Sequence, residues 1–118
     1  MPADITITDT RLYTVRPNTP VEIKVAIGDR QAGGTSLMYK GVERTAGTGF
    51  EPIGAPGEDV RFNVLHCVTT VRDIDPDHNH TSVKYTLRGG PVEQEYPFQM
   101  EVSADGHARY VIDFVFVQ

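Results

Sequence analysis

The chain has 118 residues and a formal net charge of −5, a length that fits one domain, residues 1–118. Its Lys and Arg residues are scattered, which argues against a nucleic-acid partner, because phosphate binding needs clustered cations. No apolar run approaches the roughly 20 residues that cross a bilayer, and the amino terminus lacks the basic and apolar regions of a secretory signal. We therefore expect no membrane insertion and a cytoplasmic location by default, unless the chain is a mature fragment or is exported by another route.

Alternation of apolar and polar residues, which is the period of a β-strand, recurs along the whole chain. It predicts seven strands, at residues 4–15, 21–28, 36–44, 59–74, 82–89, 95–103 and 108–118. The long strand at 59–74 is apolar on both faces, so we expect it in the interior of a sheet. No segment shows the 3.6-residue period of an amphipathic helix.

Strands of this spacing, separated by Gly and Pro, indicate an all-β fold. We expect a two-sheet antiparallel β-sandwich that is immunoglobulin-like in general architecture, with a small β-barrel as the alternative. The chain has no tryptophan and a single cysteine, so it lacks the tryptophan and the disulfide of true immunoglobulin domains. The pattern therefore indicates an architecture and no family.

The last two predicted strands suggest how they pair. Their apolar residues have even numbers on both strands, so a hairpin with a three-residue loop would keep both apolar sets on the core face. This hairpin places Met100 opposite Tyr110 and Phe98 opposite Ile112. The same pattern predicts that Phe98, Ile112 and Phe114 are buried.

Two segments are rich in residues that interrupt strands. We expect a turn at Gly33–Gly34 in "RQAGGTS". The segment "TAGTGFEPIGAPGED", residues 45–59, is expected to be a long loop because glycine and proline recur throughout it. Its apolar residues Phe50 and Ile53 are the predicted binding residues, which either contact a partner or fold back onto the sandwich.

The segment "RDIDPDHNHTSV", residues 72–83, holds the candidate metal ligands. These are Asp73, Asp75, Asp77, His78 and His80. Carboxylates at alternate positions are typical of an EF-hand calcium loop, but the glycine and glutamate which that loop requires are replaced, and no helices flank it. A looser Ca²⁺ site, or a Zn²⁺ site using the histidines, stays open. Because Pro, Asp and Asn also form turns, the preferred interpretation is a plain hairpin connection without a cofactor.

The remaining residues with reactive side chains are interpreted as structural. Cys67 is expected to be a small core residue, and His66 is expected to be a core histidine with one hydrogen bond. Because adjacent residues of a strand point to opposite faces, these two side chains should not form a catalytic pair.

Together these patterns favour a non-catalytic module that binds a protein partner or another copy of itself, through its loops or its edge strands. One alternative is a Ca²⁺-assisted carbohydrate- or surface-binding module that uses residues 73–80. The other is a metal-dependent enzyme that uses His66, His78 and His80.

Overall fold

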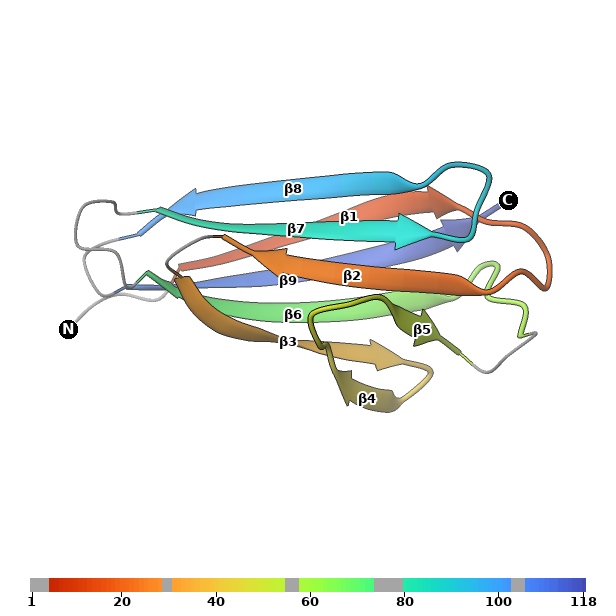
Figure 1. The fold of residues 1–118 in the computed structure, drawn as a ribbon, viewed down its shortest axis with the longest axis horizontal. Coiled ribbons are helices and arrows are strands. Elements are labelled where there is room, and N and C mark those ends of the chain that lie inside the picture. The colour runs from red at the N-terminus through yellow and green to blue at the C-terminus, as the bar shows by residue number, and fades with distance from the viewer. Residues whose placement is uncertain (1–4, 29–30, 55–57, 74–79, 103–105) are drawn as a thin grey trace.

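The computed structural model describes residues 5–28, 31–54, 58–73, 80–102 and 106–118, which fold into two packed β-sheets (Figure 1). The strands are β1 (Ile5–Thr14), β2 (Val21–Ile27), β3 (Gln31–Tyr39), β4 (Val42–Thr45), β5 (Glu51–Ile53), β6 (Val64–Asp73), β7 (His80–Arg88), β8 (Gln94–Glu101) and β9 (His107–Val117). Within these ranges, no helix is long and apolar enough to cross a membrane.

One sheet has five strands in the order β1-β9-β6-β3-β4, and the other has four in the order β5-β2-β7-β8. The described strands pair antiparallel, except that β1 and β9 run parallel. The predicted sandwich is therefore confirmed, with more strands than the seven expected, and the fold is not a closed barrel. The long strand expected in the interior of a sheet is β6, which lies between β9 and β3.

Alternate residues of most strands form the core between the sheets, as the sequence predicted, whereas β4 is exposed at all four positions. The ring of Phe114 on β9 meets Tyr85 and Tyr96 of the other sheet edge to face, with centroids 5.6 and 5.0 Å apart. Cys67 on β6 is fully buried, which confirms it as a core residue. The predicted burial of three residues is also confirmed, for Phe98, Ile112 and Phe114.

Buried hydroxyl groups join the two sheets inside this apolar core. Thr69 on β6 is hydrogen-bonded to the hydroxyl of Tyr85 on β7 and, at 2.8 Å, to that of Thr35 on β3. Tyr110 on β9 meets Thr81 on β7 at 2.7 Å. Because each of these hydroxyls has a partner, they tie the sheets together without leaving a buried polar group unsatisfied.

The predicted hairpin of the last two strands is wrong. β8 pairs with β7 in the four-stranded sheet, whereas β9 pairs with β6 and β1 in the five-stranded sheet. Phe98 and Tyr110 do meet, but across the core, with ring centroids 6.4 Å apart. The hairpin predicted over residues 72–83 is wrong for the same reason, since β6 and β7 lie in different sheets. Alternation shows which side chains face the core, and a strand in either sheet satisfies it.

The turn predicted at Gly33–Gly34 is wrong, and so are the strand bounds predicted around it. Gly33 and Gly34 lie inside β3 and not at a turn. The turn is at Lys40 and Gly41, whose φ angles of 50° and 77° fit the type I′ turn of a two-residue hairpin. β4 runs back along β3 from this turn, so the strand predicted at 36–44 is a hairpin.

Strand β5, which pairs with β2, lies within the segment predicted as a long loop at 45–59. The strand predicted from residue 59 begins at Val64, because Phe62 has a positive φ of 67° and interrupts the extended chain. The predicted core position of His66 is also wrong. Its side chain is 43% exposed on the outer face of β6, where it pairs with Asp113, while Cys67 points into the core as expected.

Candidate functional site

The predicted metal ligands lie mostly beyond the described residues. Asp75, Asp77 and His78 fall in 74–79, which the structure does not describe, and Asp73 is the last residue of β6. His80 is exposed at the start of β7. No group of three or more His, Cys, Asp or Glu side chains in the described part of the chain could hold a metal ion. Ca²⁺ or Zn²⁺ binding at 73–80 therefore stays a prediction.

The predicted binding residues Phe50 and Ile53 occupy different environments. Ile53 is buried at the end of β5 and belongs to the core. Phe50 is half-buried on the outer side of the four-stranded sheet, where the Arg88 guanidinium lies 3.6 Å from the centre of its ring and the Lys24 ammonium lies 5.9 Å away. The two side chains therefore do not form one contact surface.

This difference predicts unequal effects on stability. Ile53→Ala should lower the free energy of unfolding by about 2–4 kcal/mol, because it leaves a cavity in the core. Phe50→Ala should lower it by about 1 kcal/mol, the contribution of a partly exposed cation–π contact. Urea unfolding of the two variants measures both values. An equal or larger loss in Phe50→Ala would place Phe50 among the residues that hold the fold together.

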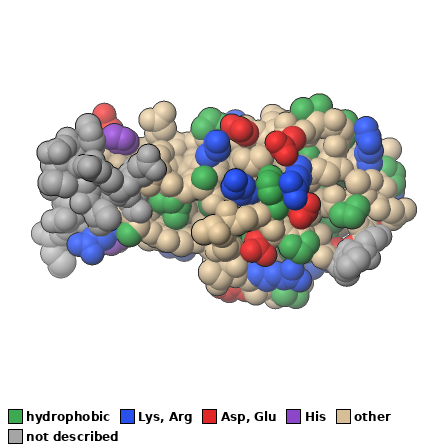
Figure 2. Space-filling model, viewed as in Figure 1, with side chains coloured by type: hydrophobic (Ala, Val, Ile, Leu, Met, Phe, Trp, Pro, Cys, Tyr) green, Lys and Arg blue, Asp and Glu red, His purple; other side chains and the backbone are tan. Residues whose placement is uncertain are grey.

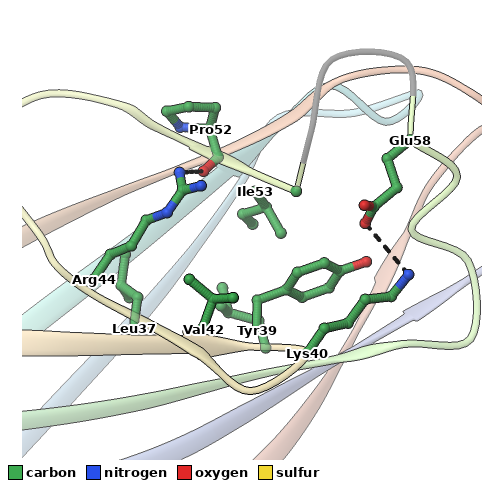
Figure 3. Close-up of a pocket in the computed structure, with 10 residues that line it drawn as sticks. Leu37, Tyr39, Lys40, Val42, Arg44, Pro52, Ile53 and Glu58 are labelled. Carbon is green, nitrogen blue, oxygen red and sulfur yellow. Dashed lines mark hydrogen bonds and ion pairs between the residues drawn. The ribbon is translucent and has the colours of Figure 1, made fainter.

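A pocket of about 190 Å³ opens between the β3–β4 hairpin and β5, at one side of the sandwich (Figure 3). Its apolar walls come from four different strands, and the residues are Leu37, Val42, Ile53 and Leu65. Arg44 stands at one end, where its guanidinium donates a long hydrogen bond of 3.4 Å to the Pro52 carbonyl. The pocket is therefore mainly apolar, with polar groups at its ends.

The other end of the pocket holds Tyr39, Lys40 and Glu58. The Lys40 Nζ lies 3.5 Å from Glu58 Oε2, and the Tyr39 hydroxyl points toward this ion pair. Tyr39 is only 8% exposed, and its hydroxyl has no hydrogen-bond partner among the described residues. Burial, and then the nearby Glu58 carboxylate, raise the pKa of Tyr39, so the hydroxyl stays protonated and can donate a hydrogen bond at neutral pH.

Gly54 explains how Glu58 comes to lie at the pocket. Its φ of 74° belongs to the left-handed region that favours glycine. A Cβ at Gly54 would lie 2.7 Å from Glu58 Oε2, closer than atoms pack. The glycine thus lets the chain turn sharply after β5 and leaves room for the carboxylate.

A second candidate site is the outer surface of the five-stranded sheet, which we call the five-strand face. Leu12, Val115 and Val64 lie side by side across β1, β9 and β6, and Leu12 is 61% exposed and Val64 45%. In the next row His66 lies beside Asp113. The same face also carries Thr8, Thr10, Val68, Val111 and Met38, and the charged residues Arg72, Arg109 and Glu43. Valine and threonine dominate this surface.

The outer surface of the four-stranded sheet has a different composition. Arg88 pairs with Glu22 at 3.0 Å, and Lys84 pairs with Glu95 at 3.5 Å. Figure 2 shows acidic and basic side chains interspersed over this side of the molecule. Such a surface is typical of a sheet that faces water.

Comparisons with protein-family models, with curated proteins and with solved structures found no match for this chain. His66 and Asp113 form an imidazole–carboxylate pair, but Cys67 points into the opposite face of the sheet, and burial raises the pKa of its thiol. The side chain beside His66 on β3 is Met38, which is not a nucleophile. This arrangement does not supply the nucleophile that a catalytic triad needs.

Proposed function

We propose that this protein is a non-catalytic interaction module that associates with a second copy of itself through the five-strand face. The observation that supports this proposal is the contrast between the two outer surfaces of the sandwich. One carries two ion pairs, whereas the other carries exposed Leu12 and Val64 in a continuous row with Val115, next to a single His66–Asp113 pair. The core of a protein–protein interface is depleted of charged residues, as this row of three apolar side chains is.

Phe62 is a second observation that supports the proposed interface. It lies two residues before the start of β6 at Val64, and its backbone N–H donates a hydrogen bond of 2.6 Å to the Phe116 carbonyl. The residue is 73% exposed, and its positive φ is a conformation that costs a non-glycine residue about 1–3 kcal/mol. Holding a phenyl ring in water at such a cost is consistent with a role in binding.

The size of the face suits a modest interface. Its long strands β1, β3, β6 and β9 have 9 to 11 residues each. At about 4.8 Å between strands and 3.3 Å per residue, they cover roughly 600 Å² on each copy. Two such faces bury about 1,200 Å² in total, the lower end of the range for specific interfaces.

The edge strands of the two sheets are poorly suited to pair with a strand of another copy, so association through the five-strand face is favoured. Pro52 and Pro97 lie in the edge strands β5 and β8, where each removes a backbone donor. On the edge strand β1, Asp9 accepts the Thr10 N–H at 2.9 Å, and the Leu12 carbonyl accepts the Tyr96 hydroxyl at 2.9 Å. These groups are then not available to pair with another strand.

The pattern of the face is complementary to itself. A two-fold axis parallel to the strands and between β6 and β9 brings His66 of one copy over Asp113 of the other. The same axis brings Val64 over Val115 and Val68 over Val111. An imidazole and a carboxylate then meet at the centre, with apolar side chains on both sides.

Sedimentation measurements test this proposal. The chain should associate weakly, to a dimer that forms between about 10 μM and 1 mM, a free energy of association of roughly −4 to −7 kcal/mol. Val64→Lys should weaken association at least about ten-fold, because the lysine has to be buried against apolar side chains. Val92→Lys is the matched control, since Val92 is exposed but lies away from the face, and it should dimerise normally. A chain that stays monomeric throughout this range, or equal effects of the two substitutions, would contradict the proposal.

A further inference from the structure

The pocket beside β5 contains a buried hydroxyl group, that of Tyr39, which is not explained by the packing of the fold. The Tyr39 hydroxyl is buried without a hydrogen-bond partner among the described residues. An unsatisfied buried polar group typically costs about 1–3 kcal/mol, and native structures rarely keep one without a reason. The hydroxyls of Tyr85 and Tyr110, also in this core, both have partners. Tyr39 differs from them because its ring forms the wall of an open pocket.

The volume of the pocket limits what it can hold. Pockets for drug-sized ligands measure about 300–1,000 Å³. This pocket measures about 190 Å³, which is room for one aromatic ring. Its walls at Leu37, Val42 and Ile53 are apolar, so the body of the ligand must be apolar as well.

The charged residues at the Tyr39 end of the pocket determine which polar group a ligand can carry there. Glu58 lies there with Lys40, which balances its charge. A carboxylate on the ligand would be brought toward the Glu58 carboxylate, which is unfavourable. A neutral hydroxyl can accept a hydrogen bond from Tyr39 and still present its own proton to the carboxylate.

We propose that this pocket binds a phenol, that is, an aromatic ring whose hydroxyl oxygen accepts a hydrogen bond from Tyr39. A tyrosine side chain of a protein partner and a free small phenol share this chemistry. The site is independent of the five-strand face, because its wall residues Leu37, Tyr39 and Leu65 lie on the core side of the five-stranded sheet.

Titration with p-cresol and toluene, followed by NMR of the Leu37 and Ile53 methyl groups, tests the proposal. In the unchanged protein p-cresol should shift these methyl signals. Tyr39→Phe should weaken p-cresol binding about five-fold, the effect of one hydrogen bond, and leave toluene binding unchanged. Tyr39→Phe should also melt no lower than the parent, since the lost hydroxyl has no hydrogen-bond partner in the part of the chain that the structure describes.

Absence of any shift with p-cresol, or an equal loss of affinity for both ligands in Tyr39→Phe, would overturn the proposal. A tyrosine-containing tripeptide distinguishes the two sources of the phenol. If the tripeptide binds as tightly as p-cresol, the pocket is open enough to receive a side chain of a partner. If p-cresol binds and the tripeptide does not, the ligand is a free small phenol. Dimerisation through the five-strand face should be the same in Tyr39→Phe, so the two proposals can fail separately.

Discussion

Phe114→Ala is expected to lower the free energy of unfolding by about 3–5 kcal/mol, a large part of the roughly 5–15 kcal/mol that stabilises a domain. Phe114 lies on β9 with no exposed surface, and its ring contacts Tyr85 and Tyr96 of the opposite sheet. Removing the ring leaves a cavity that both sheets line, and neither sheet can close it alone. Chemical denaturation with urea, monitored by tyrosine fluorescence, measures the loss.

Phe62→Ala is the matched control, because it removes the same ring from an exposed position. It should change the free energy of unfolding by no more than about 0.5 kcal/mol, as is usual for surface residues. If Phe114→Ala unfolds as late as Phe62→Ala, the core of this protein has been assigned wrongly.

Gly33→Ala is expected to cost about 3 kcal/mol or more, because the added methyl group has no room. A Cβ at Gly33 would overlap the Thr70 carbonyl oxygen and lie 3.1 Å from the Cα of Val71. These are backbone atoms of β6, which cannot rotate aside as a side chain could. The two strands would have to separate where Gly33 pairs with Val71.

Gly34→Ala, one residue further along the same strand, provides the control. A Cβ there meets nothing within 4 Å. This substitution should be neutral or stabilise the protein by about 0.5 kcal/mol, since alanine loses less backbone entropy on folding. Thermal melting of the two variants, with amide exchange of Thr70 and Val71, measures the contrast. Similar melting temperatures for the two would mean that β3 and β6 are not as close at Gly33 as described.

The proposed binding surfaces were only partly predictable from the sequence. Ile53 stands out in the sequence as an apolar residue in a segment rich in glycine, and it does line the pocket. Tyr39 lies in a predicted strand, but no sequence pattern predicted that its hydroxyl would be buried beside a pocket. The pocket combines residues from β3, β4, β5 and β6. Such a site depends on which strands are neighbours, and residue spacing along one strand carries no information about that.

His66 shows the same limit on the five-strand face. Its strand is apolar on both sides, so alternation could not tell which side faces the core. The structure places Cys67 inside and His66 outside, beside Asp113, which lies 47 residues away along the chain. The pairing of His66 with Asp113 can be recognised only once β6 and β9 are known to be neighbours.

The sequence by itself determined that the chain is an all-β sandwich and which residues of most strands are buried. On β9, the even-numbered residues Tyr110, Ile112 and Phe114 face the core because successive side chains of a strand alternate in direction. The tertiary structure decided the neighbours: β8 joins β7, and β9 lies between β6 and β1. The physical reason is that burying an apolar side chain stabilises the fold equally in either sheet. The same alternating pattern therefore fits a β9 strand that pairs with β8 and one that pairs with β6 and β1. The choice between them depends on the packing of rings and hydroxyls from distant strands, such as Phe114 with Tyr96 and Tyr110 with Thr81.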